Sequence, residues 1–130
     1  MCKLIKVNTN YDSSVMVADY KAEIIRHIIS TAKKCPDIDA IMLFGSVLEE
    51  RCKEKSDIDI VIISKKTVNA LSDRKSFNEF MKDLYLLDFT QEYDFLYFKS
   101  IDEIYQKKEK VPICKELAEK GQIIYKRQAA

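Results

Sequence analysis

Two short stretches decide how this chain folds: LFGS at residues 43–46 and DIDIVII at residues 57–63. Each belongs to a short apolar run bounded by turn residues, a pattern that predicts a buried strand. We expect Gly45 to end the first strand, and residues 46–52 to form a short helix before a polar loop. Because the second run stays apolar on both faces beyond Asp59, its strand is expected in the centre of a sheet.

The remaining sequence predicts helices and strands on either side of this unit. Ser-x-x-Glu sequences, which are typical of helix starts, occur at Ser46, Ser76 and Ser100. Pro112 suits the first turn of a last helix, and Gly121 suits its end. Beyond the short helix after Gly45, helices are expected over about residues 15–34, 76–87, 100–110 and 112–120. Further strands are expected over residues 92–98 and 122–125, and a loop over residues 64–73.

This order of elements favours an α/β (α+β) fold, a small mixed β-sheet covered by helices. With 130 residues, the chain is expected to form a single domain over residues 1–130. Residues 1–16 are expected to be irregular, with a short edge strand at residues 3–7 as the alternative. We expect residues 126–130 to form a frayed tail.

The composition is that of an ordinary folded domain, with 47% hydrophobic and 33% charged residues. A formal net charge of +1 gives no electrostatic case for binding nucleic acid or a membrane surface. No apolar run approaches the length of a membrane span, and the first residues lack the apolar segment of a signal peptide. We therefore expect a cytoplasmic protein. The four cysteines are scattered and His27 is the single histidine, so a zinc site is not expected.

Three carboxylates carry the candidate chemistry. Asp57 and Asp59 are two residues apart on one strand, so their side chains point to the same face. Carboxylates held that close repel each other unless a cation lies between them, and Mg²⁺ is the natural oxygen-liganded cation. Asp94 interrupts an otherwise apolar and aromatic strand. If that strand lies beside the one with Asp59, the three acids form one cluster.

Gly45 and Ser46 form the candidate phosphate site. Free backbone N–H groups at the start of a helix favour an anion, and Gly45 has no side chain to block its approach. Each feature taken alone can also be explained without a catalytic function. Carboxylates are common at strand starts, Ser46 would serve as a helix cap, and Asp94 would form an ion pair with a lysine. The joint arrangement favours phosphoryl or nucleotidyl transfer assisted by two metal ions.

The spacing Gly45-Ser46, ten residues, Asp57-x-Asp59 matches the signature GSx10DxD. In this the chain resembles the minimal nucleotidyltransferase (MNT) branch of the DNA polymerase β-like superfamily, over about residues 20–125. The resemblance implies a polymerase β palm-like nucleotidyltransferase fold. It also implies transfer of a nucleoside monophosphate, with AMP from ATP expected, from a nucleoside triphosphate to a hydroxyl group, releasing pyrophosphate.

The resemblance gives a role to each residue of the pattern. Gly45 and Ser46 would hold the terminal phosphates of the nucleotide, and Asp57 and Asp59 would bind two Mg²⁺ ions. Asp94 stands where the family has its third carboxylate, which binds the catalytic metal and takes the proton of the attacking hydroxyl.

One departure from the family pattern follows the Gly-Ser pair. Many relatives carry a basic stretch there, whereas this chain has Glu49 and Glu50, offset by Arg51, with Lys53 or Lys55 as a further candidate. The expected consequence is weaker nucleotide binding, with the carboxylate set intact.

Three functions remain open. The first is the antitoxin of a toxin–antitoxin pair, which would silence a HEPN-type toxin partner by transferring AMP to one of its tyrosines. The second is a non-catalytic MNT-fold binding module that covers the active surface of a partner. The third, less favoured, is a small-molecule (antibiotic) nucleotidyltransferase, since such relatives usually carry an additional helical domain.

Overall fold

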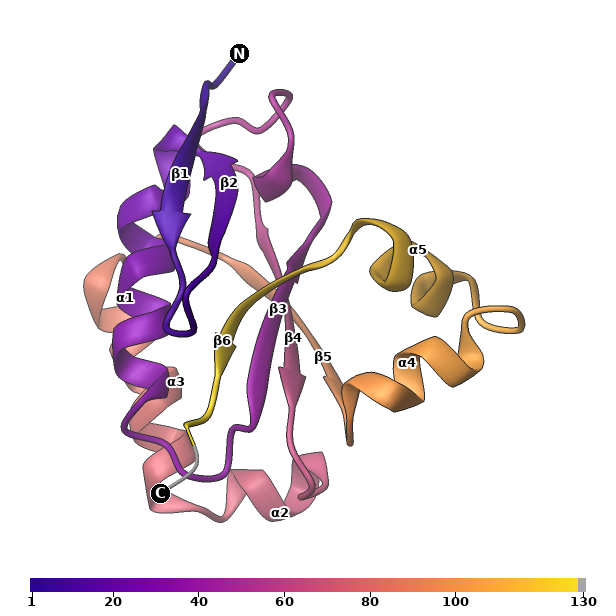
Figure 1. The fold of residues 1–130 in the computed structure, drawn as a ribbon. Helices are drawn as coiled ribbons and strands as arrows, with labels where there is room; N and C mark the ends of the chain where they lie inside the picture. Colours follow the sequence, from indigo (N-terminus) through magenta and orange to yellow (C-terminus); the bar gives the residue numbers. More distant parts are fainter. Residues whose placement is uncertain (129–130) are drawn as a thin grey trace.

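The computed structural model describes residues 1–128, which form two β-sheets and five α-helices (Figure 1). The strands are β1 (Leu4–Asn8), β2 (Ser14–Ala18), β3 (Ala40–Phe44), β4 (Ile58–Ile63), β5 (Tyr93–Phe98) and β6 (Gln122–Lys126). The α-helices are α1 (Ala22–Ala32), α2 (Val68–Ser72), α3 (Lys75–Leu87), α4 (Ile101–Lys107) and α5 (Pro112–Lys120). Two 3-10 helices, η1 (Asp19–Lys21) and η2 (Gly45–Leu48), join them. The predicted α/β architecture, a small mixed sheet covered by helices, is confirmed.

The main sheet has four strands in the order β5-β4-β3-β6. β3 pairs antiparallel with β4 and β6, whereas β4 and β5 run parallel. β4 therefore lies inside the sheet, as its unbroken apolar run after Asp59 predicts. The parallel pairing puts the starts of β4 and β5 at the same edge of the sheet, and Asp59 faces Asp94 across the two strands.

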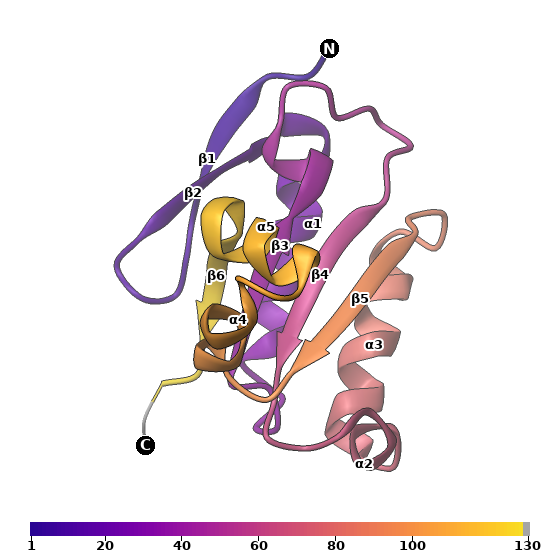
Figure 2. The same cartoon turned by 90° about the vertical axis from the view of Figure 1, so that its right-hand side faces the viewer.

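The two faces of the main sheet are covered by different helices. α1 and α3 lie on one face and α4 and α5 on the other, which we call the α1/α3 face and the α4/α5 face (Figures 1 and 2). Side chains alternate along β4, so Ile60 and Ile62 enter the core under α1 and α3, while Val61 and Ile63 pack toward α4 and α5. By the same alternation Asp59 belongs to the α4/α5 face.

The amino-terminal region is more regular than its sequence predicts. β1 and β2 form an antiparallel hairpin, so residues 1–16 are not irregular and the expected edge strand at 3–7 is present. The helix expected from residue 15 begins only at Ala22. Val15 and Val17 are buried while Met16 is half-exposed, and this alternation is the two-residue period of a strand. The apolar pattern typical of a helix therefore begins at Ala22, and the prediction of a helix over the preceding residues is wrong.

The predicted helix starts are correct in part. Ser100 caps α4 by accepting a hydrogen bond from the Glu103 backbone N–H at 3.1 Å. α3 begins one residue before Ser76, whose hydroxyl instead donates to Asp37. The expected loop at residues 64–73 contains α2, which is capped by the Thr67 hydroxyl. Pro112 lies at the start of α5, as predicted, and α5 ends at Lys120, just before Gly121.

The carboxyl terminus is partly ordered. Lys126 ends β6, and the Arg127 guanidinium donates to Asp39 at 2.7 Å, so these two residues are not frayed. Gln128, the next residue of the predicted frayed tail, donates from its side chain to the Asn10 carbonyl at 3.0 Å, and residues 129–130 lie outside the described residues. Within residues 1–128, none of the helices combines the length and the apolar character that crossing a membrane requires.

Candidate active site

Gly45 brings the backbone of η2 against Asp59. Its φ of +76° lies in the left-handed region, which a glycine adopts without strain. A Cβ atom built on Gly45 would overlap the carboxylate Oδ2 of Asp59, so the absence of a side chain leaves room for this acid. The register explains the approach, because Phe44 pairs with Asp59 across β3 and β4 and Gly45 follows directly. The Gly45 turn and the Asp59 carboxylate therefore form one site.

Asp59 and Asp94 lie side by side on the α4/α5 face. They are register partners in the parallel pair of β4 and β5, and Asp59 is half-buried while Asp94 is exposed. The pKa of Asp59 is raised to about 6, and burial is the largest cause. The hydrogen bond and charge of Asp94 and the charges of Asp57 and Glu116 supply the rest of this shift. The structure thus confirms the predicted neighbourhood of these two acids.

Asp57 lies just before β4 and is exposed. Within residues 1–128, no three Asp, Glu, His or Cys side chains are gathered closely enough to hold a metal ion. The expected three-carboxylate cluster is therefore present as one close pair, Asp59 and Asp94, with Asp57 as a nearby charge.

The donor chemistry of the pair nevertheless fits a divalent cation. Both groups are carboxylates, which are the ligands that Mg²⁺ prefers. None of the ion pairs among the described residues involves Asp59 or Asp94, so no protein cation is in direct contact with either carboxylate, and the charge of Asp94 raises the pKa of Asp59.

Ser46 lies in η2, which differs from the expected helix. The element is a 3-10 helix that ends at Leu48 rather than at about residue 52. Ser46 does not cap it: the Ser46 carbonyl accepts from the Glu49 backbone N–H at 2.9 Å, and Glu49 does not reach back to close a capping box. The Glu49 carboxylate instead pairs with the Arg51 guanidinium at 2.5 Å. The nearest cation to the Gly-Ser turn along the chain is thus already bound to an acid.

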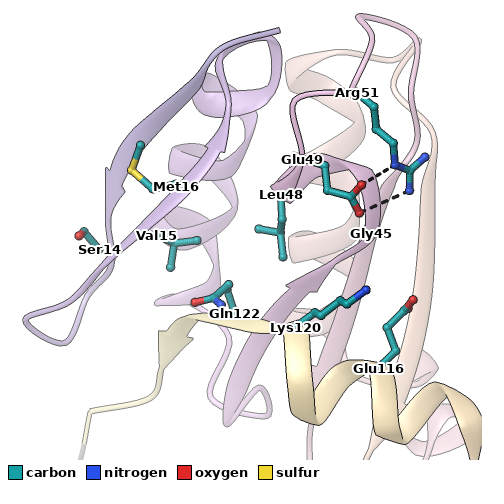
Figure 3. A pocket seen from close by; sticks show the side chains of 10 residues that line it. All are labelled: Ser14, Val15, Met16, Gly45, Leu48, Glu49, Arg51, Glu116, Lys120 and Gln122. Carbon is teal, nitrogen blue, oxygen red and sulfur yellow. Dashed lines mark hydrogen bonds and ion pairs between the residues drawn. The ribbon is translucent and has the colours of Figure 1, made fainter. Parts of the chain in front are cut away.

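A cleft of about 640 Å³ opens beside Gly45 (Figure 3). Val15 and Leu48 supply part of an apolar wall. Glu116 and Lys120 extend from α5 toward η2 and the segment just after it, which carries Glu49 and Arg51. The cleft therefore combines apolar surface with cations and acids next to the Gly-Ser turn, as a site for a charged organic molecule requires. Its remaining lining residues are Ser14, Met16, Gly45 and Gln122.

Sequence reasoning missed the contribution of α5 to this cleft. Glu116 and Lys120 are four residues apart, so they share one helix face, and this spacing is the available signal. Nothing local shows that this face points toward η2, which is about 70 residues earlier in the chain. His27, the single histidine, is partly buried, and its Nε2 lies 3.2 Å from the Asp83 carbonyl.

Comparison with known proteins agrees with this geometry. No curated protein matches the chain. A family model described as "Polymerase beta, Nucleotidyltransferase" matches residues 26–130, well over half of the sequence. The match includes the Gly-Ser turn and all three carboxylates. This chain therefore belongs to the polymerase β-like nucleotidyltransferase family.

Proposed function

We propose that this protein transfers a nucleoside monophosphate, AMP from ATP, to a hydroxyl group at the edge of the sheet where Asp59 meets Asp94. The observation that carries the proposal is this pair of adjacent carboxylates, which form no ion pair among the described residues, with Asp59 directly against the backbone of Gly45. Family membership supports nucleotidyl transfer as the type of reaction. The donor, the metal and the acceptor are the specific parts of the proposal.

The proposed reaction is a displacement at the α-phosphorus. The acceptor oxygen forms a bond to this phosphorus, and the bond from the α-phosphorus to the oxygen that bridges to the β-phosphate breaks. Pyrophosphate leaves with the electron pair of that bond. Asp94 is exposed, so it can accept the proton of the attacking hydroxyl as the bond forms.

The chain's own residues would hold the reactants. Asp59 and Asp94 would ligate Mg²⁺, and a rotation of the exposed Asp57 side chain would add a third carboxylate. When bound, two Mg²⁺ ions would neutralise phosphate charge and polarise the attacked phosphorus. Gly45 and Ser46 would present backbone N–H groups to the terminal phosphates, and Lys120 is the cleft cation placed to add a positive charge.

The proposed acceptor is a tyrosine of a HEPN-type toxin partner, the acceptor that the MNT resemblance implies. The cleft beside Gly45 opens to the surface, so a side chain of another protein can reach it without passing through the core. This protein would then act as an antitoxin.

Transfer of label tests the proposal. The protein is incubated with Mg²⁺ and α-³²P-labelled ATP, and in parallel with labelled GTP, CTP and UTP, together with a lysate of its host. We expect a labelled protein band that is lost in Asp57→Asn and on adding EDTA. Asp12→Asn, which changes an exposed acid at the tip of the β1–β2 hairpin, is the matched control. Equal labelling by wild type and Asp57→Asn would contradict the proposal.

One observation favours a second candidate, a non-catalytic binding module. Arg51, the cation next to the phosphate turn, is paired with Glu49, which weakens the site for a triphosphate. This function predicts that neutralisation of the partner survives Asp57→Asn. A loss of neutralisation in that variant would exclude it.

A further inference from the structure

Lys21 is a lysine whose side chain is only 2% exposed. It ends η1, and its Nζ donates to the Glu54 carbonyl at 2.5 Å and to Oε1 of Gln91 at 2.7 Å. Both acceptors are uncharged, since one is a backbone carbonyl and the other an amide oxygen, and none of the ion pairs among residues 1–128 includes Lys21. Burial lowers the pKa of this ammonium, as expected for a desolvated cation. Because burying an ammonium group costs free energy, we expect the buried Lys21 to have a structural role that offsets this cost.

Gln91 extends the network from Lys21 to two backbone segments. Its side chain is almost fully buried, at 6% exposure. While its Oε1 accepts from Lys21, its Nε2 donates to the Ser56 carbonyl at 3.0 Å and to the Glu92 carbonyl at 2.7 Å. Lys21 and Gln91 therefore tie the loop that leads into β4 to the residue that leads into β5. We call these two side chains the Lys21–Gln91 clamp.

The two segments that the clamp holds carry the carboxylates. Ser56 directly precedes Asp57. The Glu92 carbonyl also accepts from the Ile58 backbone N–H at 3.1 Å, where the pairing of β4 and β5 begins. The register pair that follows Ile58 and Tyr93 is Asp59 and Asp94. A shift at Ser56 or Glu92 would therefore move the carboxylates relative to one another.

We propose that Lys21 and Gln91 are positioning residues of the carboxylate site, which lock the starts of β4 and β5 so that Asp57, Asp59 and Asp94 can meet one divalent cation. The inference rests on the proposed function, because it takes these acids to be the metal site. Neither clamp residue lines the cleft or touches the reactants. The Lys21 ammonium is also near enough to Asp57 for their charges to interact, so it eases the repulsion within the acidic edge.

Binding of Mn²⁺, followed by electron paramagnetic resonance on the full chain, tests the clamp without requiring activity. Lys21→Met removes the ammonium and keeps the apolar stem. Gln91→Glu keeps an oxygen acceptor for Lys21 but loses the N–H donors to Ser56 and Glu92. We expect each variant to weaken Mn²⁺ binding about 10- to 100-fold, as loss of groups that orient metal ligands does. Faster amide hydrogen exchange at Ile58 should accompany the weaker binding.

Two controls separate positioning from stability. Lys33→Met removes the same charge at an exposed position just after α1. Leu71→Ala empties a buried site in α2, which lies beyond the opposite end of β4 from Asp59, and so lowers stability without touching the clamp. Neither control should change the Mn²⁺ dissociation constant by more than about twofold, since neither contacts the ligands or their supports.

Each outcome decides the inference. Unchanged Mn²⁺ affinity in folded Gln91→Glu overturns it, even if Lys21→Met fails to fold, and so does an equal loss in Leu71→Ala. If Asp57→Asn abolishes label transfer while both clamp variants bind Mn²⁺ normally, the clamp fails and the proposed function stands. If wild type binds no Mn²⁺, the proposed positioning role of the clamp and the proposed metal site are both contradicted. The label-transfer experiment then tests nucleotidyl transfer by itself.

Discussion

The two faces of the main sheet differ in how completely they are covered. On the α1/α3 face, 23 buried residues form one apolar cluster that extends from the β1–β2 hairpin to α3. On the α4/α5 face, the cluster has 8 buried residues. The starts of β4 and β5 extend past α4 and α5, and the carboxylates lie there (Figure 2). The α1/α3 face therefore holds the larger buried core, and the α4/α5 face leaves uncovered the edge of the sheet where we propose that the reaction occurs.

Neighbouring residues of β4 show the same contrast between a buried face and an open face. On β4, Ile58 and Ile60 are fully buried toward the α1/α3 face, whereas Asp59 between them is half-buried with a raised pKa. Because Ile58 and Ile60 are packed into the core on the opposite face, they hold the backbone of β4 in place. The strand can therefore keep the Asp59 carboxylate half-buried although burial of its charge is unfavourable. The following predictions test this division, from the largest effect on stability to the smallest.

Truncation of the larger cluster should cost the most stability. Phe80 is 1% exposed and packs against Phe77 on the α1/α3 face. We expect Phe80→Ala to lower the free energy of unfolding by about 3–5 kcal/mol, and Leu117→Ala on the α4/α5 face by about 2–3 kcal/mol, because the smaller cluster encloses fewer neighbours. Urea unfolding measures both. A larger loss in Leu117→Ala would contradict the contrast between the faces.

Gly45→Ala should disturb the open edge directly. The new Cβ would be strained at a φ of +76° and would displace the Asp59 carboxylate. We expect a loss of about 2 kcal/mol in the free energy of unfolding, together with loss of label transfer. Ser46→Ala, next to it in η2, is the control for stability. Wild-type stability in Gly45→Ala would show that Asp59 does not need the space beside Gly45.

Asp59→Asn should make the metal-free protein more stable at neutral pH. The folded-state pKa of Asp59 is about 6 against an ordinary value of 3.8, so the folded state holds the proton more tightly. Wild type therefore loses stability as the pH rises from about 4 to about 6, and Asp59→Asn does not. After allowance for solvent screening, we expect a gain of about 1–2 kcal/mol in Asp59→Asn over wild type at pH 7.5.

Unfolding in EDTA at pH 3.5 and pH 7.5 measures this difference. At pH 3.5 the two proteins should be nearly equal, because the carboxyl is then largely protonated in both the folded and the unfolded state. If the difference in the free energy of unfolding between wild type and Asp59→Asn does not change with pH, burial and the neighbouring acids do not raise the pKa of Asp59.

Glu49→Gln should have the smallest effect on stability, because the Glu49–Arg51 pair is exposed at both ends. Its effect should instead fall on ligand binding. Removal of the acid frees Arg51 beside the phosphate turn, so we expect ATP to bind about two- to fivefold more tightly. Isothermal titration with ATP and Mg²⁺ measures the change, and Glu79→Gln on α3 is the control. Weaker binding would mean that Glu49 itself contacts the nucleotide or its metal.

The carboxylate edge could largely be predicted from the sequence, because its signals are local. A short apolar run marks each of β3, β4 and β5, and Asp59 and Asp94 stand out as acids within or beside such runs. The expected edge strand at residues 3–7 is present, but the sequence predicts a helix in place of β2, because the two-residue period in Val15 and Val17 lies next to the longer helical pattern of α1.

The clamp could not be predicted, because its contacts join residues far apart in the chain. Lys21 is 33 residues from Glu54 and 70 residues from Gln91. A lysine before a helix is most often exposed, and nothing near it in the sequence indicates burial. For the same reason, the sequence does not predict that α5 lines the cleft. Tertiary packing determines which residues lie opposite Glu116 and Lys120.

Nucleotidyl transfer by Asp59→Asn tests the central claim most directly, because this variant is expected to fold at least as well as wild type. Label from α-³²P-ATP is followed in host lysate with Mg²⁺, at equal protein concentration and pH 7.5. A fall of about a thousandfold or more, in a variant of undiminished stability, is the result expected if the open edge is the catalytic site. Transfer at the wild-type rate would contradict the claim and leave the carboxylate pair without a catalytic role.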